Sequence, residues 1–332
     1  MLFQLLIYSL FCFFLFFLSA KISYKFKLVD LPNERKIHSK PTVYTGGIIL
    51  SFIFLFTIQA LDIFDPNLAL IISISFLISI VGFIDDKYHL NTGGKLSLQV
   101  IPIFYLIVFG NFSLTNIGNY NYFDLELGTF ALPFTLLCVL FLTNAFNYFD
   151  GLDGTLGLTI ISVMCILVFL SHDKNFNIFL LILIIPLSVF LFFNFSFLKL
   201  PKIFLGDSGS LLLGFIVSFL LIYLAKKNVI HPILLAWSVV IFVYEFLSIN
   251  LIRLKNNQSL FKAGQDHLHH FLLKKTKSIF FTNTFIFLLN LILFFLGYFS
   301  YLIFNPFISL ILFITLFIVF LIFRNNLIKY NK

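Results

Sequence analysis

Residues 305–323 read Asn-Pro-Phe-Ile-Ser-Leu-Ile-Leu-Phe-Ile-Thr-Leu-Phe-Ile-Val-Phe-Leu-Ile-Phe and contain no charged side chain. A helix of about 20 apolar residues crosses the hydrocarbon core of a bilayer. Similar runs recur along all 332 residues, of which 60% are hydrophobic and only 11% are charged. Soluble domains are about 25% charged, and disordered chains have low hydrophobicity. The composition therefore excludes both classes and predicts an integral membrane protein.

Eleven such runs are candidate membrane spans. They lie near residues 2–20, 44–61, 68–84, 97–111, 128–145, 156–171, 177–193, 209–225, 230–250, 280–302 and 305–323. The runs are continuous, whereas the strands of a membrane β-barrel alternate apolar and polar residues. The sequence thus predicts an all-α polytopic bundle of about eleven transmembrane helices, forming a single membrane-embedded domain over residues 1–332.

The distribution of positive charge predicts the orientation of this bundle. One set of alternating connections, with the C-terminal tail, holds 19 of the 22 Lys and Arg residues, and the other set holds three. Positive residues concentrate on the cytoplasmic side, so we expect the N-terminus outside and the C-terminus in the cytoplasm. The net charge of +8 then needs no nucleic-acid partner. Arg324 falls in the tail, so Glu245 is the only acidic or basic residue within a predicted span, and we expect it to face the bundle or the site.

Polar motifs cluster in the predicted cytoplasmic segments. These segments are 21–43, 85–96, 144–155, 194–208 and 251–279. The first contains Pro-Asn-Glu-Arg35-Lys36-Ile-His38. Its basic residues are suited both to anionic lipid headgroups and to a phosphate group, and both interpretations stay open.

The second segment opens with the adjacent carboxylates Asp85 and Asp86 and also contains Lys95. The two carboxylates repel each other, so a compensating cation is expected. Mg²⁺ suits them because it binds one or two carboxylates and completes its shell with water and phosphate oxygens. A solvated acidic pair is the simpler alternative for this motif taken alone.

In the third segment, polar residues recur every third position directly after an apolar run, at Asn144, Asn147, Asp150 and Asp153. Two amides and two acids are costly at a membrane boundary, which favours a functional role. In the fourth segment, Asp207 lies between glycines just before a span. It is either a helix N-cap or, at a helix N-terminus suited to phosphate, a ligand for a bridging Mg²⁺.

Three histidines, His267, His269 and His270, lie in the last segment near several lysines. Zinc sites usually include Cys, or His at fixed spacing with a carboxylate. The segment has no Cys, so a phosphate-binding role is favoured over zinc. Acids for Mg²⁺ beside cations for phosphate indicate phosphoryl transfer at the membrane surface.

These five segments, in this order, resemble the polyprenyl-phosphate N-acetylhexosamine-1-phosphate transferases of glycosyltransferase family 4. The match runs from residue 30 to residue 270. The Pro32–His38 stretch and the span count are most similar to the undecaprenyl-phosphate GlcNAc-1-phosphate transferases, which begin O-antigen (lipopolysaccharide) or teichoic acid synthesis in cell wall biogenesis. The resemblance implies a multi-pass enzyme of the bacterial inner (plasma) membrane.

By this resemblance, a UDP-N-acetylhexosamine gives its sugar-1-phosphate to undecaprenyl phosphate and releases UMP, with Mg²⁺, or Mn²⁺ in its place, as cofactor. The expected partners are these two substrates and membrane lipids, with a homodimer as one option and no nucleic acid. The resemblance assigns catalysis to Asp85, Asp86, Asp150 and Asp153, metal binding to Asp207 and Asp86, and substrate binding to Arg35, Lys36, His38, Lys95, Asn144, Asn147, His267, His269 and His270.

The stretch Ser259-Leu-Phe-Lys-Ala-Gly264-Gln265 departs from the family's Ser-Pro-Phe-x-x-Asp-Arg (or Lys). Because this loop helps to choose the sugar in the family, GlcNAc is the first expectation, with FucNAc, QuiNAc, GalNAc or UDP-MurNAc-pentapeptide as alternatives. A polytopic transporter is the alternative of a different class. Transporters place polar residues near the bilayer midplane, whereas here the motifs lie at predicted cytoplasmic ends.

Overall fold

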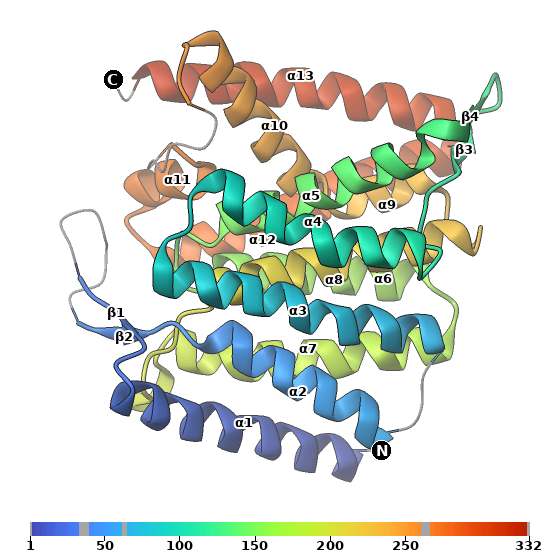
Figure 1. Cartoon of the computed structure of the whole chain (residues 1–332). Helices are drawn as coiled ribbons and strands as arrows, with labels where there is room; N and C mark the ends of the chain where they lie inside the picture. Colours follow the sequence, from blue (N-terminus) through green and yellow to red (C-terminus); the bar gives the residue numbers. More distant parts are fainter. Residues whose placement is uncertain (1, 33–39, 62–64, 260–265, 331–332) are drawn as a thin grey trace. The chain divides into compact units, whose positions relative to one another are not determined.

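The computed structural model is almost entirely helical (Figure 1), in agreement with the predicted all-α class. It describes residues 2–32, 40–61, 65–259 and 266–330. The elements in chain order are α1 (Leu2–Lys25), β1 (Val29–Asp30), β2 (Thr42–Val43), α2 (Gly46–Leu61), α3 (Pro66–Tyr88), α4 (Thr92–Val108), β3 (Asn116–Asn119), β4 (Asp124–Glu126), the 3₁₀ turn η1 (Gly128–Phe130), α5 (Ala131–Phe149), α6 (Thr155–Leu170), α7 (Lys174–Asn194), the 3₁₀ turn η2 (Phe197–Lys199), α8 (Gly206–Lys226), α9 (Pro232–Ser238), α10 (Val240–Lys255), α11 (Leu268–Thr276), α12 (Ile279–Ile303) and α13 (Pro306–Tyr330).

The apolar helices make this chain a multi-pass membrane protein. Within the described residues, seven helices are long and apolar enough to cross a bilayer, or eight if the bent pair α9 and α10 is one span. α2, α4 and α6 are shorter apolar helices. Each of the eleven predicted ranges overlaps one of these helices or the bent pair. The number of spans and the orientation of the termini stay predictions.

One predicted boundary is wrong. Helix α13 continues past residue 323 to Tyr330, so Arg324 lies within a helix and not in a tail. Arg324 is fully buried, and Glu245 is only 1% exposed. Glu245 therefore avoids lipid, as expected, but it is not the only charged residue within an apolar helix.

Two aspartates fix the starts of long helices. Asp65 accepts a hydrogen bond from the backbone N–H of Asn67 at the start of α3, at 2.9 Å. Asp173 accepts one from the N–H of Asn175 at the start of α7, also at 2.9 Å. The first turn of a helix leaves backbone N–H groups without partners inside the helix, so these carboxylates have a structural role as N-caps.

The chain divides into two compact units, Met1–Leu106 with Asp173–Val217, and Ile107–His172 with Ser218–Lys332. In the first unit, α1 lies against α2 and α7, and α2 lies against α3 (Figure 1). The backbone at the start of α2 pairs with the backbone before α8: Phe204 N–H donates to the carbonyl of Val43 at 2.8 Å, and Gly47 N–H donates to the carbonyl of Leu205 at 2.8 Å. This pairing sets where α8 begins.

Glycines allow close approach of three helices in the first unit. A Cβ atom on Gly82 of α3 would collide with the backbone of Asp207 and Ser208, and one on Gly47 of α2 would collide with the backbone of Gly209. Small residues at such contacts let helix backbones pack closely within membranes. The start of α8 is thereby held against both α2 and α3.

In the second unit, α12 packs against α6, α9 and α13, and α10 packs against α5 and α13. α9 and α10 meet at a 75° bend. Backbone groups freed by a break need new partners where water is scarce. Asn290 of α12 supplies them: its amide nitrogen donates to the carbonyl of Ser238 at 3.2 Å, and its oxygen accepts from Ile241 N–H at 3.4 Å. The same nitrogen donates to Ser162 Oγ of α6 at 2.9 Å.

Candidate active site

Two of the predicted acidic residues meet at one lysine in the first unit. Lys95 Nζ, in the first turn of α4, lies 2.8 Å from Asp85 Oδ2 and 2.5 Å from Asp207 Oδ2. The other oxygen of Asp85 accepts the backbone N–H of Leu90 at 2.8 Å. Residues from α3, α4 and α8 are therefore joined through charge-assisted hydrogen bonds, which are shorter and stronger than neutral ones.

Asp86 has a different role from its neighbour. Its Oδ1 accepts the backbone N–H of Asp207 at 2.9 Å, and its Oδ2 accepts that of Ser208 at 3.2 Å. A carboxylate is favourable at a helix N-terminus, where N–H groups point outward. Gly206 permits this approach, since its φ is +72° and a Cβ there would lie 2.6 Å from Asp86 Oδ2. Asp86 thus caps α8 from another helix, and the carboxylate of Asp207 interacts with Lys95.

This acidic cluster, defined as Asp85, Asp86, Lys95 and Asp207, has the donor chemistry of a site for a hard cation. Three carboxylates and one ammonium give a formal sum of −2, and the Asp207 side chain is 32% exposed. Among the residues that the structure describes, no three His, Cys, Asp or Glu side chains form a group that could hold a metal by themselves. Mg²⁺ needs only one or two carboxylates, with water and phosphate completing its shell, so the residues fit this ion.

The Asn144–Asp153 segment lies in the second unit and is split by a helix end. Asn144 and Asn147 lie on α5, which ends at Phe149, while Asp150 and Asp153 lie in the turn before α6. The turn is held from α12, because Asn283 Nδ2 donates to the carbonyl of Asp153 at 2.7 Å. Sequence reasoning did not identify Asn283, although an amide within an apolar run is a usable signal.

The three histidines lie beside this segment in the same unit. His267 precedes α11, and His269 and His270 lie in its first turn. The His267 ring is 5.0 Å from the Tyr148 ring, measured between centroids. A Cβ on Gly151 would collide with the His269 imidazole, so any larger residue at that position would displace the ring. The structure therefore brings the third and fifth predicted motifs together.

His269 is fully buried, and neither ring nitrogen has a hydrogen-bond partner among the described residues. Burial holds the pKa of His269 well below its ordinary value, with contributions from the neighbouring histidines and Arg324. Burial, then the charges of His267 and Lys274, lowers the pKa of His270 to about 4. Both side chains are neutral at pH 7, and a bound anion would favour their protonation.

The lowered pKa of His270 predicts a pH-dependent stability. The unfolded chain takes up this proton near pH 6.5, whereas the folded protein does so only near pH 4. The contribution of His270 to stability is therefore complete above pH 6.5 and is lost as the pH falls toward 4. We expect the Tm of the detergent-solubilised protein to fall over this window, and to fall less in His270→Gln.

His172→Gln is the matched control for this measurement, because His172 is exposed in the connection before α7. It should keep the wild-type pH dependence. An unchanged pH profile in His270→Gln would contradict the role given to the buried imidazole.

Three predicted residues, Arg35, Lys36 and His38, lie outside the described residues, as do residues 260–265 of the stretch that departs from the family pattern. Of the other predicted residues, the structure groups Asp85, Asp86, Lys95 and Asp207 in one unit. In the other unit it places the Asn144–Asp153 segment beside the histidines. Sequence reasoning missed Asn283 and Arg324 as residues that support these groups, and it missed the contact of Gly151 with His269.

Acidic and basic side chains gathered at the ends of apolar helices mark a functional site of a membrane protein. A family model described as glycosyl transferase family 4 matches residues 68–225. The undecaprenyl-phosphate alpha-N-acetylglucosaminyl 1-phosphate transferases of Escherichia coli O157:H7 and of Escherichia coli strain K12 are each 30% identical over 268 residues, or 79% of this chain and 73% of theirs. A probable undecaprenyl-phosphate N-acetylglucosaminyl 1-phosphate transferase of Bacillus subtilis strain 168 is 33% identical over 75% of this chain and 71% of its own length.

The chain belongs to glycosyl transferase family 4. This membership favours a transferase over the transporter alternative. Transporters use broken helices to bind substrate, whereas at the break between α9 and α10 the Ser238 carbonyl and the Ile241 N–H are bonded to Asn290.

Proposed function

We propose that this protein transfers an N-acetylhexosamine-1-phosphate, GlcNAc-1-phosphate in the first instance, from its UDP-sugar to undecaprenyl phosphate. A phosphate oxygen of the lipid attacks the β-phosphorus of the UDP-sugar. The bond from that phosphorus to the oxygen bridging the two phosphates breaks, and UMP leaves with the bridging oxygen. The product is undecaprenyl diphosphate linked to the sugar.

The observation that carries this proposal is the Lys95 contact with both Asp85 and Asp207. It places two carboxylates and an ammonium at the start of α8, where backbone N–H groups favour anions. The names of the relatives support the polyprenyl phosphate acceptor and the sugar. Phosphoryl transfer depends mainly on positioning and on electrostatic stabilisation of the transferring group, and such an arrangement offers both.

Each residue of the acidic cluster has a distinct part in this proposal. Lys95 holds the carboxylates of Asp85 and Asp207 in place and offers positive charge to a phosphate oxygen. Asp85 is the group placed to accept a proton from the lipid phosphate. Asp86 fixes the first turn of α8, and therefore the position of Asp207, through its two backbone hydrogen bonds.

We propose Mg²⁺ as the cofactor, with Mn²⁺ as its substitute. Asp207 is the proposed ligand, with Asp86 as a second one. When bound, the ion offsets the charge that develops on the diphosphate. The fit lies in the oxygen donors, in their excess negative charge and in the exposure of Asp207.

The second unit is proposed to hold the donor. The amides Asn144 and Asn147, with Asp150 and Asp153, are suited to the nucleotide and sugar. The segment 266–270, called the histidine turn below, carries His267, His269 and His270, and Lys274 is nearby. It is suited to the phosphates, because a neutral imidazole gains a proton and a charge when an anion approaches.

We further propose that the protein lies in a bacterial plasma membrane, with its N-terminus outside and its C-terminus in the cytoplasm. The 19-to-3 division of Lys and Arg supports this orientation. The bacterial sources of the relatives support the location.

The test is a transfer assay with the purified protein in detergent, undecaprenyl phosphate and radiolabelled UDP-GlcNAc. We expect a labelled glycolipid and an equal amount of UMP, both lost with EDTA and restored by Mg²⁺. A panel of UDP-sugars (FucNAc, QuiNAc, GalNAc and MurNAc-pentapeptide) identifies the donor if GlcNAc is not transferred. Absence of glycolipid with every donor would refute the proposal.

A further inference from the structure

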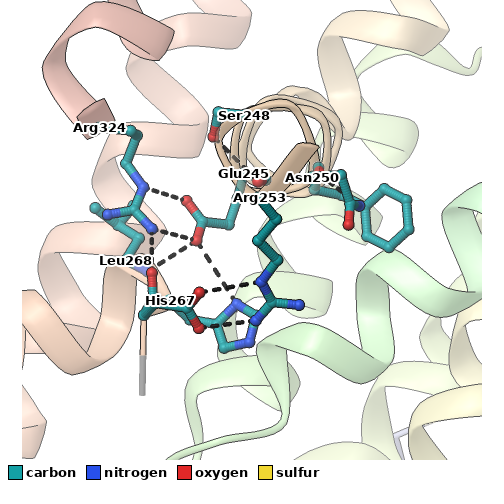
Figure 2. A network of polar contacts seen from close by, with 9 residues as sticks. Glu245, Ser248, Asn250, Arg253, His267, Leu268 and Arg324 are labelled. Atoms are coloured by element: carbon teal, nitrogen blue, oxygen red, sulfur yellow. Dashed lines mark hydrogen bonds and ion pairs between the residues drawn. The ribbon is translucent and has the colours of Figure 1, made fainter. Parts of the chain in front are cut away.

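A buried ion pair joins α10 to the last helix, α13, in the second unit (Figure 2). Arg324 Nε donates to Glu245 Oε2, and Arg324 Nη2 donates to Glu245 Oε1, both at 2.8 Å. The side chains are 0% and 1% exposed. The planar guanidinium and the carboxylate meet in the two-point geometry that Arg offers and Lys does not.

Both members of this pair also bind the backbone that carries the histidines. Glu245 Oε1 accepts the N–H of Leu268 at 2.9 Å, and Arg324 Nη2 donates to the carbonyl of Asp266 at 2.6 Å. His267 lies between these two anchored residues, and its Nδ1 is 3.8 Å from Glu245 Oε1. Figure 2 shows Arg324, Leu268 and His267 around the carboxylate of Glu245.

A second arginine fixes the same turn from the end of α10. Arg253 Nε donates to Asp266 Oδ2 at 3.0 Å, and its Nη2 donates to Asp266 Oδ1 at 2.8 Å. Although burial alone would raise the pKa of Asp266, these hydrogen bonds and the charge of Arg253 hold it below its ordinary value. The side chain of Asp266 is thus held by α10, while its backbone carbonyl is held by α13.

Stability alone is a weak reason for such a pair. Removing two charges from water costs about as much as their attraction returns, and apolar replacements of similar size are often neutral or stabilising. Arg324 Nη1 also has no hydrogen-bond partner among the described residues, which adds a further cost. What the pair supplies that apolar residues do not is directed hydrogen bonds to the backbone on both sides of His267.

We propose that Arg324, acting through Glu245, is a positioning residue for the histidine turn. It holds residues 266–268 so that His267, His269 and His270 are aligned toward the donor phosphates. α13 is then part of the transfer machinery although it contributes no group that contacts substrate. This inference rests on the proposed function.

The experiment measures three variants in the transfer assay. They are Arg324→Lys, Arg324→Met, and a double variant that carries both Glu245→Gln and Arg324→Met. A misplacement of about 1 Å costs on the order of 10²-fold in rate, so we expect kcat/KM for the UDP-sugar to fall by about that factor in Arg324→Met. KM for undecaprenyl phosphate should stay at the wild-type value. Arg324→Lys keeps the charge without the two-point geometry, so it should recover part of the loss.

Arg324→Met leaves a buried carboxylate unpaired and can fail to fold for that reason. The double variant removes both charges and restores thermal stability toward wild type, which separates folding from positioning. Under the proposal, the double variant is stable and still has a raised KM for the UDP-sugar. A stable double variant with wild-type donor kinetics would overturn the proposal.

Tyr244→Phe is the matched control, because Tyr244 OH donates to the carbonyl of Phe313 at 2.5 Å and so also joins α10 to α13. It removes a hydrogen bond between the same helices without touching residues 266–268, and it should keep wild-type donor kinetics. An equal fall of kcat/KM for the UDP-sugar in Tyr244→Phe would mean that Arg324 only contributes packing between α10 and α13, and it would refute the positioning role.

Amide hydrogen exchange gives a readout that needs no activity. The N–H of Leu268 should exchange at least tenfold faster in Arg324→Met and in the double variant than in Tyr244→Phe, since local protection reports local stability. If the wild-type protein makes no glycolipid but exchange still rises, the proposed function fails and the structural role of Arg324 stands. If the wild type is active and neither exchange nor donor KM changes, the inference about Arg324 fails.

Discussion

Replacing Asp207 by asparagine should lower Mg²⁺-dependent glycolipid formation on the order of 10³-fold. Removing one group that stabilises developing charge costs about 10²–10³-fold, and here the same change weakens metal binding and takes away one of the two carboxylates at Lys95. The size of the side chain is kept, so the fold should be unaffected. The measurement is the initial rate of transfer as a function of Mg²⁺ concentration, with thermal unfolding recorded for the same preparation.

Asp173→Asn is the control for this change. Asp173 caps α7 through backbone N–H groups, and asparagine is an equally good N-cap. Its activity should equal that of the wild type. Activity of Asp207→Asn within tenfold of wild type, with an unchanged Mg²⁺ requirement, would remove Asp207 from the metal site.

Gly82→Ala should have the next largest effect, although Gly82 bears no functional group. An added Cβ would collide with the backbone of Asp207 and Ser208, so α3 and the start of α8 must separate. Asp86 would then lose its hydrogen bonds to α8, and Lys95 could no longer reach Asp85 and Asp207 together. We expect a loss of about 1–3 kcal/mol in the free energy of unfolding and a fall in transfer on the order of 10²-fold.

Gly93→Ala provides the matched comparison, because it is the same chemical change close to Lys95. A Cβ there would lie 3.6 Å from Asn91 Oδ1, an ordinary contact, and alanine favours helix more than glycine does. Its stability and activity should equal or exceed those of the wild type. The measurement is thermal unfolding and the transfer rate of both variants, recorded together. Equal stability and equal transfer rates of Gly82→Ala and Gly93→Ala would contradict the close packing of α3 and α8.

The sequence was sufficient to predict the class of fold and much of the candidate site. Continuous apolar runs predict helices because hydropathy and length are local properties. From the sequence alone, Asp207 fits either capping or metal binding. The sequence shows which N–H groups are close to Asp207 along the chain, but it does not show which carboxylates approach from elsewhere in the fold. The structure resolves the capping question: Asp86, 121 residues away in sequence, accepts the first N–H groups of α8.

Arg324 illustrates a limit of the same reasoning. A charged residue directly after an apolar run is normally the end of the span, and counting it in the tail agreed with the distribution of positive charge. Its partner, Glu245, lies 79 residues earlier in the sequence, and no local pattern connects the two. Long-range pairs of this kind, like the contact of Gly151 with His269, depend on tertiary packing and are not predictable from spacing.

The amide of Asn290 has a mechanical consequence. It connects α6, both sides of the break between α9 and α10, and its own helix α12 through one side chain. A bend with one backbone group on each side bonded to the same buried side chain is fixed and is not a hinge, because opening it would break both hydrogen bonds at once. We therefore expect the angle between α9 and α10 to stay the same during turnover.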